Sequence, residues 1–143
     1  MIKKRTPKNQ EGAAAVEFAI ILPLFIVLVF GIIEFSLAFY DKAMITNASR
    51  EGARRGIVYT TDPDATVSNA EIESVVTAYL SDNLITFGPD TDVDVAIARE
   101  GFAPGDDLSV TVTYSYGYLL LPAFIDAISG PINLTARTVM RME

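Results

Sequence analysis

A long apolar run near the N-terminus constrains this chain more than any other feature. From residue 13 to residue 40 nearly every side chain is apolar or small, and residues 18–33 include no charged or polar group. As a helix, residues 13–34 would extend about 33 Å, enough to cross the hydrocarbon core of a bilayer. The sequence therefore predicts a transmembrane helix over residues 13–40. Pro23 lies inside it, and because membrane helices tolerate proline we expect a kink there and not an end.

The charges on either side of the run predict its orientation. Residues 1–12 contain four basic residues and one acid, whereas the rest of the 143-residue chain contains seven basic and 17 acidic residues. Basic residues before a span favour the cytoplasmic side, so we expect residues 1–12 to form a basic cytoplasmic leader and the acidic body to lie outside. The acidic body also argues against nucleic acid as a partner, because that contact requires Lys and Arg.

Two glutamates interrupt the apolar run. Glu17 lies near its start, where a carboxylate without a partner is costly to bury, and carboxylates inside a membrane usually have a function. The alternative is an interfacial carboxylate that never enters the hydrocarbon. Glu34 would lie about 32 Å along the helix from Ala13, so we expect it to rest unpaired at the outer interface.

The helix is expected to continue outside the membrane over residues 41–58, which contain no proline. Met44, Ala48, Gly52 and Gly56 recur at intervals of four and therefore share one helical face. Small residues at this spacing let another backbone approach closely, which predicts a helix-packing role for Ala48, Gly52 and Gly56. The alternative is that the glycines only weaken the helix.

Residues 59–143 predict a small extracytoplasmic α+β head. Ser68 and Glu71 have the spacing of a capping box, and the apolar residues after them follow a helical period, so residues 67–84 are expected to form a short amphipathic helix. Alternating apolar and polar residues then predict three strands, near residues 93–97, 108–116 and 132–140.

The expected fold class is α+β, in the manner of a pilin. Three short strands and one helix bury little apolar surface alone. We therefore expect a long N-terminal membrane-spanning helix that continues outside and packs against a small three-stranded antiparallel sheet with a short amphipathic helix. Residues 119–128, "LLLPAFIDAI", are apolar without a strand pattern. They form either a cover for the sheet, which we favour, or an exposed patch for a partner or the membrane surface.

The composition argues against an enzyme and against a metal site. The chain has no Cys and no His, which removes thiolate chemistry and the commonest general base and metal ligand. Asp90, Asp92 and Asp94 resemble the start of a calcium loop, but Val95 and Gly101 stand where an EF-hand needs glycine and glutamate. These aspartates are expected to flank an exposed strand edge. We expect no catalytic residue, no metal and no cofactor.

Several motifs together resemble a known family. They are "EGAAAVEFAIILPLFIVLVFGIIEF" at residues 11–35, "ASREGARRG" at residues 48–56, and less specifically "VTVTYSY" and the C-terminal "VMRME". On these motifs the chain is similar to the TadE-like family, pilin-like proteins of the tight-adherence (Tad) pilus systems of bacteria. The resemblance covers nearly the whole chain in layout, and its most specific part is N-terminal.

The resemblance implies cleavage by a prepilin peptidase on the cytoplasmic side, between Gly12 and Ala13. Glu17 would become the fifth residue of the mature chain, where pilin-like proteins usually carry a glutamate, and would act in assembly. It also implies a minor or initiating subunit whose partners are the peptidase, other pilin or pilin-like subunits, the Tad inner-membrane platform and the membrane. The opposite charge that a carboxylate needs in a low-dielectric setting would come from this subunit or a neighbouring one.

Two other classes of protein remain open at this point. A secreted protein with a cleaved signal peptide would use the small-x-small site Ser36-Leu37-Ala38, although the apolar run is longer than a usual signal sequence. An uncut single-span anchor would carry an extracytoplasmic binding domain.

Overall fold

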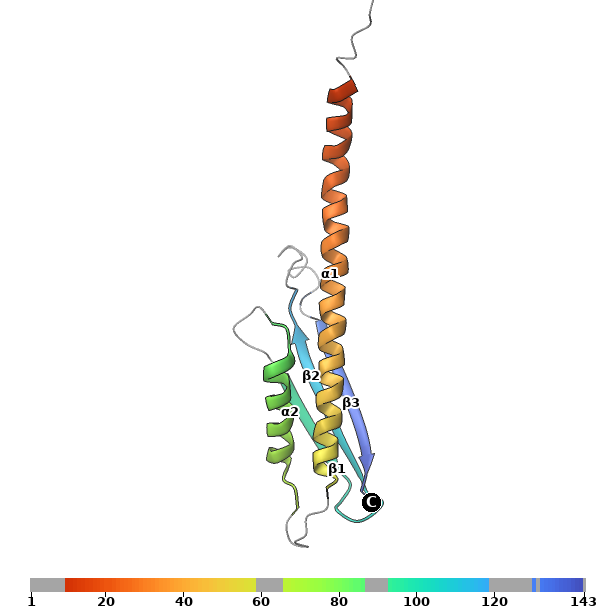
Figure 1. The fold of residues 1–143 in the computed structure, drawn as a ribbon. Helices are drawn as coiled ribbons and strands as arrows, with labels where there is room; N and C mark the ends of the chain where they lie inside the picture. Colours follow the sequence, from red (N-terminus) through yellow and green to blue (C-terminus); the bar gives the residue numbers. More distant parts are fainter. Residues whose placement is uncertain (1–9, 59–65, 87–92, 119–129, 131, 143) are drawn as a thin grey trace, which may run out of the picture.

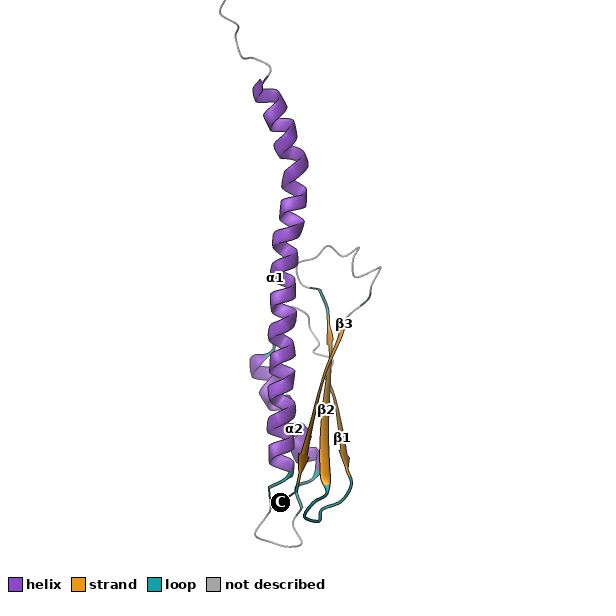
Figure 2. Ribbon diagram, turned by 90° about the vertical axis from the view of Figure 1, so that its right-hand side faces the viewer, coloured by secondary structure: helices purple, strands orange, loops and turns teal. Residues whose placement is uncertain are grey.

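The computed structural model describes residues 10–58, 66–86, 93–118, 130 and 132–142. Its main feature is helix α1 (Gln10–Gly56), which runs unbroken for 47 residues, about 70 Å at helical rise. The N-terminal half of α1 extends away from a small head, and the C-terminal half is part of that head (Figure 1). Pro23 lies within the helix, which continues through it and bends gently in its N-terminal half (Figure 2).

Helix α2 (Asn69–Asn83) begins at the predicted capping box. The Glu71 amide donates to the Ser68 hydroxyl at 3.2 Å, and the Ser68 amide donates to the Glu71 carboxylate at 2.9 Å. These two bonds satisfy backbone donors that a helix start otherwise leaves free. The predicted amphipathic helix is confirmed, with Ile72, Val76 and Leu80 as its buried face.

The sheet contains β1 (Val93–Arg99), β2 (Asp107–Tyr116) and β3 (Ile132–Arg141), antiparallel in that order. Val112 at the centre of β2 faces Val95 on one side and Ala136 on the other. The turn between β1 and β2 places Gly105 at a φ of 99°, a conformation that glycine adopts readily. The predicted α+β fold, with a three-stranded antiparallel sheet and a short helix, is confirmed.

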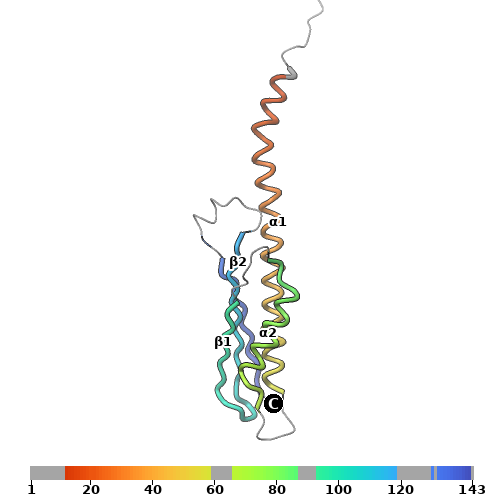
Figure 3. The backbone as a smooth tube through the Cα atoms, turned by 90° about the vertical axis from the view of Figure 1, so that its left-hand side faces the viewer, coloured from red at the N-terminus to blue at the C-terminus, as the bar shows by residue number. Residues whose placement is uncertain are grey.

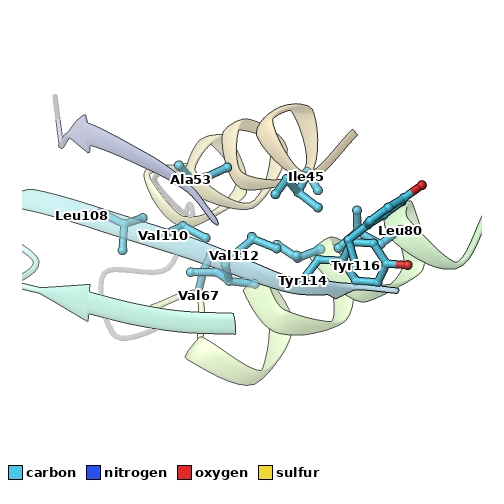
Figure 4. Packing of buried hydrophobic residues seen from close by; sticks show 13 residues of the cluster. Ile45, Ala53, Val67, Leu80, Leu108, Val110, Val112, Tyr114 and Tyr116 are labelled. Atoms are coloured by element: carbon cyan, nitrogen blue, oxygen red, sulfur yellow. The ribbon is translucent and has the colours of Figure 1, made fainter. Parts of the chain in front are cut away.

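Both helices lie on the same face of the sheet, and α2 runs beside the C-terminal half of α1 (Figures 2 and 3). Apolar side chains from all of these elements meet between the two layers, where they are shielded from solvent (Figure 4). The core comprises Ile45, Ala48 and Ala53 of α1, Val67, Ile72, Val76 and Leu80 in and before α2, and Leu108, Val110, Val112, Tyr114, Tyr116 and Ala136 of the sheet. The long helix therefore supplies one wall of the head's core, as its amphipathic partners require.

Some expectations concern parts of the chain outside the described residues. They include most of the leader, the apolar stretch 119–128, and Asp90 and Asp92. Asp94 is described and lies exposed on β1, which is an edge strand of the sheet.

Candidate functional site

The N-terminal half of α1 is the candidate assembly and membrane segment. Among the described residues, α1 is the one helix long and apolar enough to cross a membrane, and none of its most apolar stretch is buried. Large apolar side chains from Val16 to Ile33 are exposed all around it. Such exposure is unfavourable in water but favourable in lipid or against other apolar helices. One N-terminal apolar helix of this kind is compatible with a single-pass membrane anchor.

The residues predicted for processing and assembly lie at the end of α1 farthest from the head (Figure 1). Gly12, Ala13 and Glu17 are all exposed on the first turns. A Cβ atom added at Gly12 would meet no atom within 4 Å. Within the described residues, Glu17 forms no ion pair or hydrogen bond. The fold thus presents these residues to the surroundings and does not use them in the head.

Glu34 differs from its prediction. It was expected to rest unpaired at the outer interface, but it is only 3% exposed, and the Tyr116 hydroxyl donates to its Oε1 at 2.7 Å. The head begins at this position, because the end of β2 reaches up along α1 and covers the carboxylate. The protein itself therefore covers this carboxylate, and the hydrogen bond lowers the penalty for burying it. Sequence reasoning could not see this cover, because Tyr116 lies 82 residues away.

Asp41 lies two helical turns beyond Glu34 on the same side of α1 and is fully buried. Its Oδ1 accepts the backbone N–H of Ile85 at 3.0 Å, which ties the segment after α2 to the long helix. Its Oδ2 is buried and has no hydrogen-bond partner among the described residues. Burial raises the pKa of Asp41, and the Ile85 hydrogen bond opposes that rise.

Two tyrosines of β2 adjoin these carboxylates. Tyr114 and Tyr116 pack edge to face with ring centroids 6.3 Å apart. Burial raises the pKa of Tyr116, and the hydrogen bond to Glu34 raises it further, so the phenol stays a proton donor at physiological pH. We call Glu34, Asp41, Tyr114 and Tyr116 the junction cluster, because it lies where the exposed half of α1 enters the head.

The predicted packing face of α1 lies against the chain's own head. Ala48, Gly52 and Gly56 are buried, and a side chain carbon added at Gly52 would lie 2.5 Å from a methyl group of Val76. At Gly56 it would collide with Leu108 and Ile72. These glycines let α2 and β2 approach the long helix closely, within a single subunit.

Arg99 is a second residue whose place the sequence did not indicate. From the end of β1, its guanidinium donates to the carbonyl of Val67 at 2.8 Å, to the side chain of Asn69 at 3.1 Å and to the carbonyl of Gly56 at 3.4 Å. It therefore joins the end of α1 to the start of α2. Satisfying these otherwise free carbonyl groups stabilises the far end of the head.

The described residues offer no group of three or more Asp and Glu side chains that could hold a metal ion. The ion pairs among them are on the surface, such as Arg54 with Glu51 at 2.7 Å and Arg141 with Asp107 at 3.0 Å. Pairs of this kind contribute little to stability and indicate no reaction centre.

Residues 12–54 match the family model described as "TadE-like protein". The match confirms the resemblance seen in the sequence and covers the exposed half of α1 together with most of the half that packs in the head. Neither a curated protein nor a solved structure matches the chain. The matched stretch comprises 43 of the 143 residues, so the similarity to TadE-like proteins is shown for that part of the chain.

Proposed function

From the TadE-like match over residues 12–54, we propose that this chain is a minor or initiating pilin-like subunit of a bacterial Tad pilus. The observation that carries the proposal is the exposed apolar half of α1, with Glu17 near its start and a folded head at its other end. A helical stretch with no apolar partner among the described residues needs lipid or other helices around it. A pilus subunit meets both, first in the membrane and then in the fibre.

We propose that the protein sits in the bacterial inner membrane with its N-terminus in the cytoplasm and its C-terminus outside. The division follows the sequence: residues 1–12 are the leader, 13–40 the span, 41–58 the extracytoplasmic continuation of the helix, and 59–143 the head. The basic leader and the acidic body support this orientation, because cytoplasmic flanks of a span are enriched in Lys and Arg.

The proposed processing step is cleavage by a prepilin peptidase between Gly12 and Ala13. The exposure of Gly12, and its distance from the head, support access by such an enzyme. Cleavage would free the amine of Ala13 four residues before Glu17. In an assembled bundle, a positive charge from this or a neighbouring subunit would then compensate the Glu17 carboxylate, which is otherwise costly to bury.

Of the two rival proteins, the secreted one with a cleaved signal peptide fits the structure less well. Cleavage after Ala38 would remove Glu34, which the head covers and to which Tyr116 donates. A signal peptide is removed from the mature protein, so its residues are not expected to pack in the core of the head. An uncut anchor with a binding head remains the second candidate, since its fold would be the same, and the two differ in where the mature chain starts.

Mass spectrometry of the membrane-associated protein separates the three. A chain that starts at Ala13 supports the proposal, one that starts at Phe39 indicates a signal peptide, and one that starts at Met1 or Ile2 indicates an uncut anchor. Gly12→Leu should leave the leader attached, whereas Gly31→Leu is the matched control, because a Cβ atom added at either glycine meets nothing within 4 Å. Normal maturation of Gly12→Leu would show that the cleavage site is wrong.

The assembly role of Glu17 has its own test. Glu17→Ala should insert into the membrane but reduce the number of pili seen by electron microscopy. Glu73→Ala is the matched control, because Glu73 is an exposed carboxylate on α2, outside the exposed helix. Normal piliation by Glu17→Ala would remove the role assigned to this residue.

A further inference from the structure

The side chains on the two sides of α1 change from apolar to polar at different positions along the helix. On the side that faces the head, the change comes at Glu34, which Tyr116 covers. On the opposite side, which we call the free face, large apolar side chains remain exposed as far as Tyr40. The six residues from Phe35 to Tyr40 correspond to about 9 Å along the helix. The head therefore begins to cover α1 before the helix has finished presenting an apolar surface.

Aromatic rings dominate this last part of the free face. Phe35 is 64% exposed, Phe39 72% and Tyr40 40%. Ser36 lies among them, and its hydroxyl donates to the carbonyl of Ile32 at 2.7 Å, so it does not depend on water for a hydrogen bond. Between Asp41 and Ile57 the exposed side chains include no large apolar group, and Asn47 and Arg50 are exposed instead.

The position of these rings matches the interfacial layer of a bilayer. With Ala13 at the inner edge of the hydrocarbon, Glu34 falls about 32 Å away, at the outer edge, and Phe35 to Tyr40 fall about 33 to 40 Å away. The headgroup region occupies this range of heights; Tyr is enriched there, and Phe is common on the apolar face of helices that lie in that layer. The exposed apolar surface is also continuous from Val16 to Tyr40, so the same solvent is expected to cover all of it.

We propose that Phe35, Phe39 and Tyr40 bind the headgroup layer of the outer leaflet, so that the edge of the head at Glu34 and Tyr116 is set into that layer. The proposal deepens the membrane span given under the proposed function and rests on it. It also gives the junction cluster a role: the Tyr116 hydroxyl keeps a carboxylate satisfied at the height where water is replaced by lipid. The partner is the phospholipid surface.

The chain contains no Trp, so a single introduced Trp reports its own surroundings without background. Three full-length variants are compared: Phe39→Trp on the free face, Val27→Trp in the middle of the span, and Phe102→Trp in the turn after β1. Each is purified and reconstituted at low density in vesicles of phosphatidylcholine and phosphatidylglycerol. Quenching is measured with lipids brominated deep in the acyl chain, with a headgroup-attached nitroxide, and with aqueous iodide. Phe102 is the matched control, because it is an aromatic residue 52% exposed in the turn between β1 and β2.

The proposal expects Phe39→Trp to lose more fluorescence to the headgroup nitroxide than to deep bromine or iodide. Phe102→Trp should lose fluorescence to iodide alone. If Phe39→Trp behaves like Phe102→Trp, the interface lies below Phe35 and the inference is overturned. If all three quenchers leave Phe39→Trp unaffected, a second copy covers the face, and the inference is overturned as well.

Val27→Trp distinguishes failure of this inference from failure of the proposed span. Strong quenching of Val27→Trp by deep bromine, together with iodide quenching of Phe39→Trp, would retain the span and reject the interfacial contact. Absence of bromine quenching at Val27 would reject the span itself, and the interfacial contact with it.

Discussion

Replacing Tyr116 with phenylalanine should loosen the head from the long helix. In the native chain the Tyr116 hydroxyl donates to Glu34 at 2.7 Å, and both side chains are almost fully buried. Phenylalanine keeps the ring and removes only the hydroxyl. The carboxylate of Glu34 would then lose a donor at a position where the head still restricts access to water, so the folded head would be less stable relative to the unfolded one.

A hydrogen bond to a charged group contributes about 1.5–3 kcal/mol to stability, and we expect a loss of about 2 kcal/mol. For a domain of roughly this size, each kcal/mol shifts the melting temperature by about 4–8 °C, so Tyr116→Phe should lower it by roughly 10 °C. Tyr114→Phe is the matched control. Tyr114 lies on the same face of the same strand and is buried, but its hydroxyl makes no hydrogen bond to any described residue. Its replacement should change stability by less than about 1 kcal/mol.

The assay is thermal unfolding of the full-length protein in mild detergent, followed by near-ultraviolet circular dichroism. The six tyrosines supply this signal, and the exposed half of α1 contributes none of them before Tyr40. The melting of the head is thus observed separately from the helix in the detergent micelle. Hydrogen exchange of the β2 and β3 amides gives an independent measure of the same opening.

A second substitution identifies the cause of the loss. In the Tyr116→Phe background, Glu34→Gln should restore part of the lost stability, because a neutral amide is cheaper to bury than a carboxylate that has lost the Tyr116 hydrogen bond. The double-mutant cycle should therefore show a coupling between Glu34 and Tyr116 of more than about 1 kcal/mol. Equal destabilisation by Tyr116→Phe and Tyr114→Phe, with no coupling to Glu34, would refute the reasoning.

Two further predictions use other contacts of α1. Gly52→Ala should destabilise the head by about 1–3 kcal/mol, because the new methyl group would lie 2.5 Å from a methyl group of Val76. Gly31→Ala is the control and should not destabilise it, because a Cβ atom there meets nothing within 4 Å. Chemical denaturation of both variants measures the difference in the free energy of unfolding. Burial raises the pKa of Asp41 above its ordinary 3.8, so the folded state holds a proton that the unfolded state releases. Its contribution to stability is greatest below pH 3.8 and is lost as the pH rises through the raised pKa. Asp41→Asn keeps an acceptor for the Ile85 amide and should remove this loss of stability at rising pH. Stability is measured against pH for both proteins. A variant whose profile is the same as that of the native protein would contradict the prediction.

The layout of this chain could be predicted from sequence because it depends on local patterns. The helical period and capping box of α2 require only residues a few positions apart, and the alternation in the three strands is likewise local. The N-terminal, membrane-spanning part of α1 follows from the apolar run itself. Each of these features is fixed by neighbours along the chain, and each is present in the structure.

The junction cluster could not be predicted, because it depends on contacts between distant segments. Glu34 and Tyr116 meet only when β2 runs along α1, and neither residue is unusual in its own stretch of sequence. One signal was present: Glu34 and Asp41 are seven residues apart and therefore share a helical face with Ala48. Two carboxylates on the buried side of a helix indicate a covered polar site, although they do not identify what covers it.

A continuous helix that serves both the head and the membrane has a mechanical consequence. Residues of α1 from Glu34 to Gly56 form one wall of the head, so the head cannot turn about α1 without breaking its own core. The orientation of the head is therefore tied to the direction in which Glu17 points, through a continuous helix that contains one proline, Pro23. Because proline removes one backbone hydrogen bond, Pro23 is where the two ends adjust most easily. In the assembly proposed above, a contact made by Glu17 inside the bundle would thus fix which surface the head presents outside it.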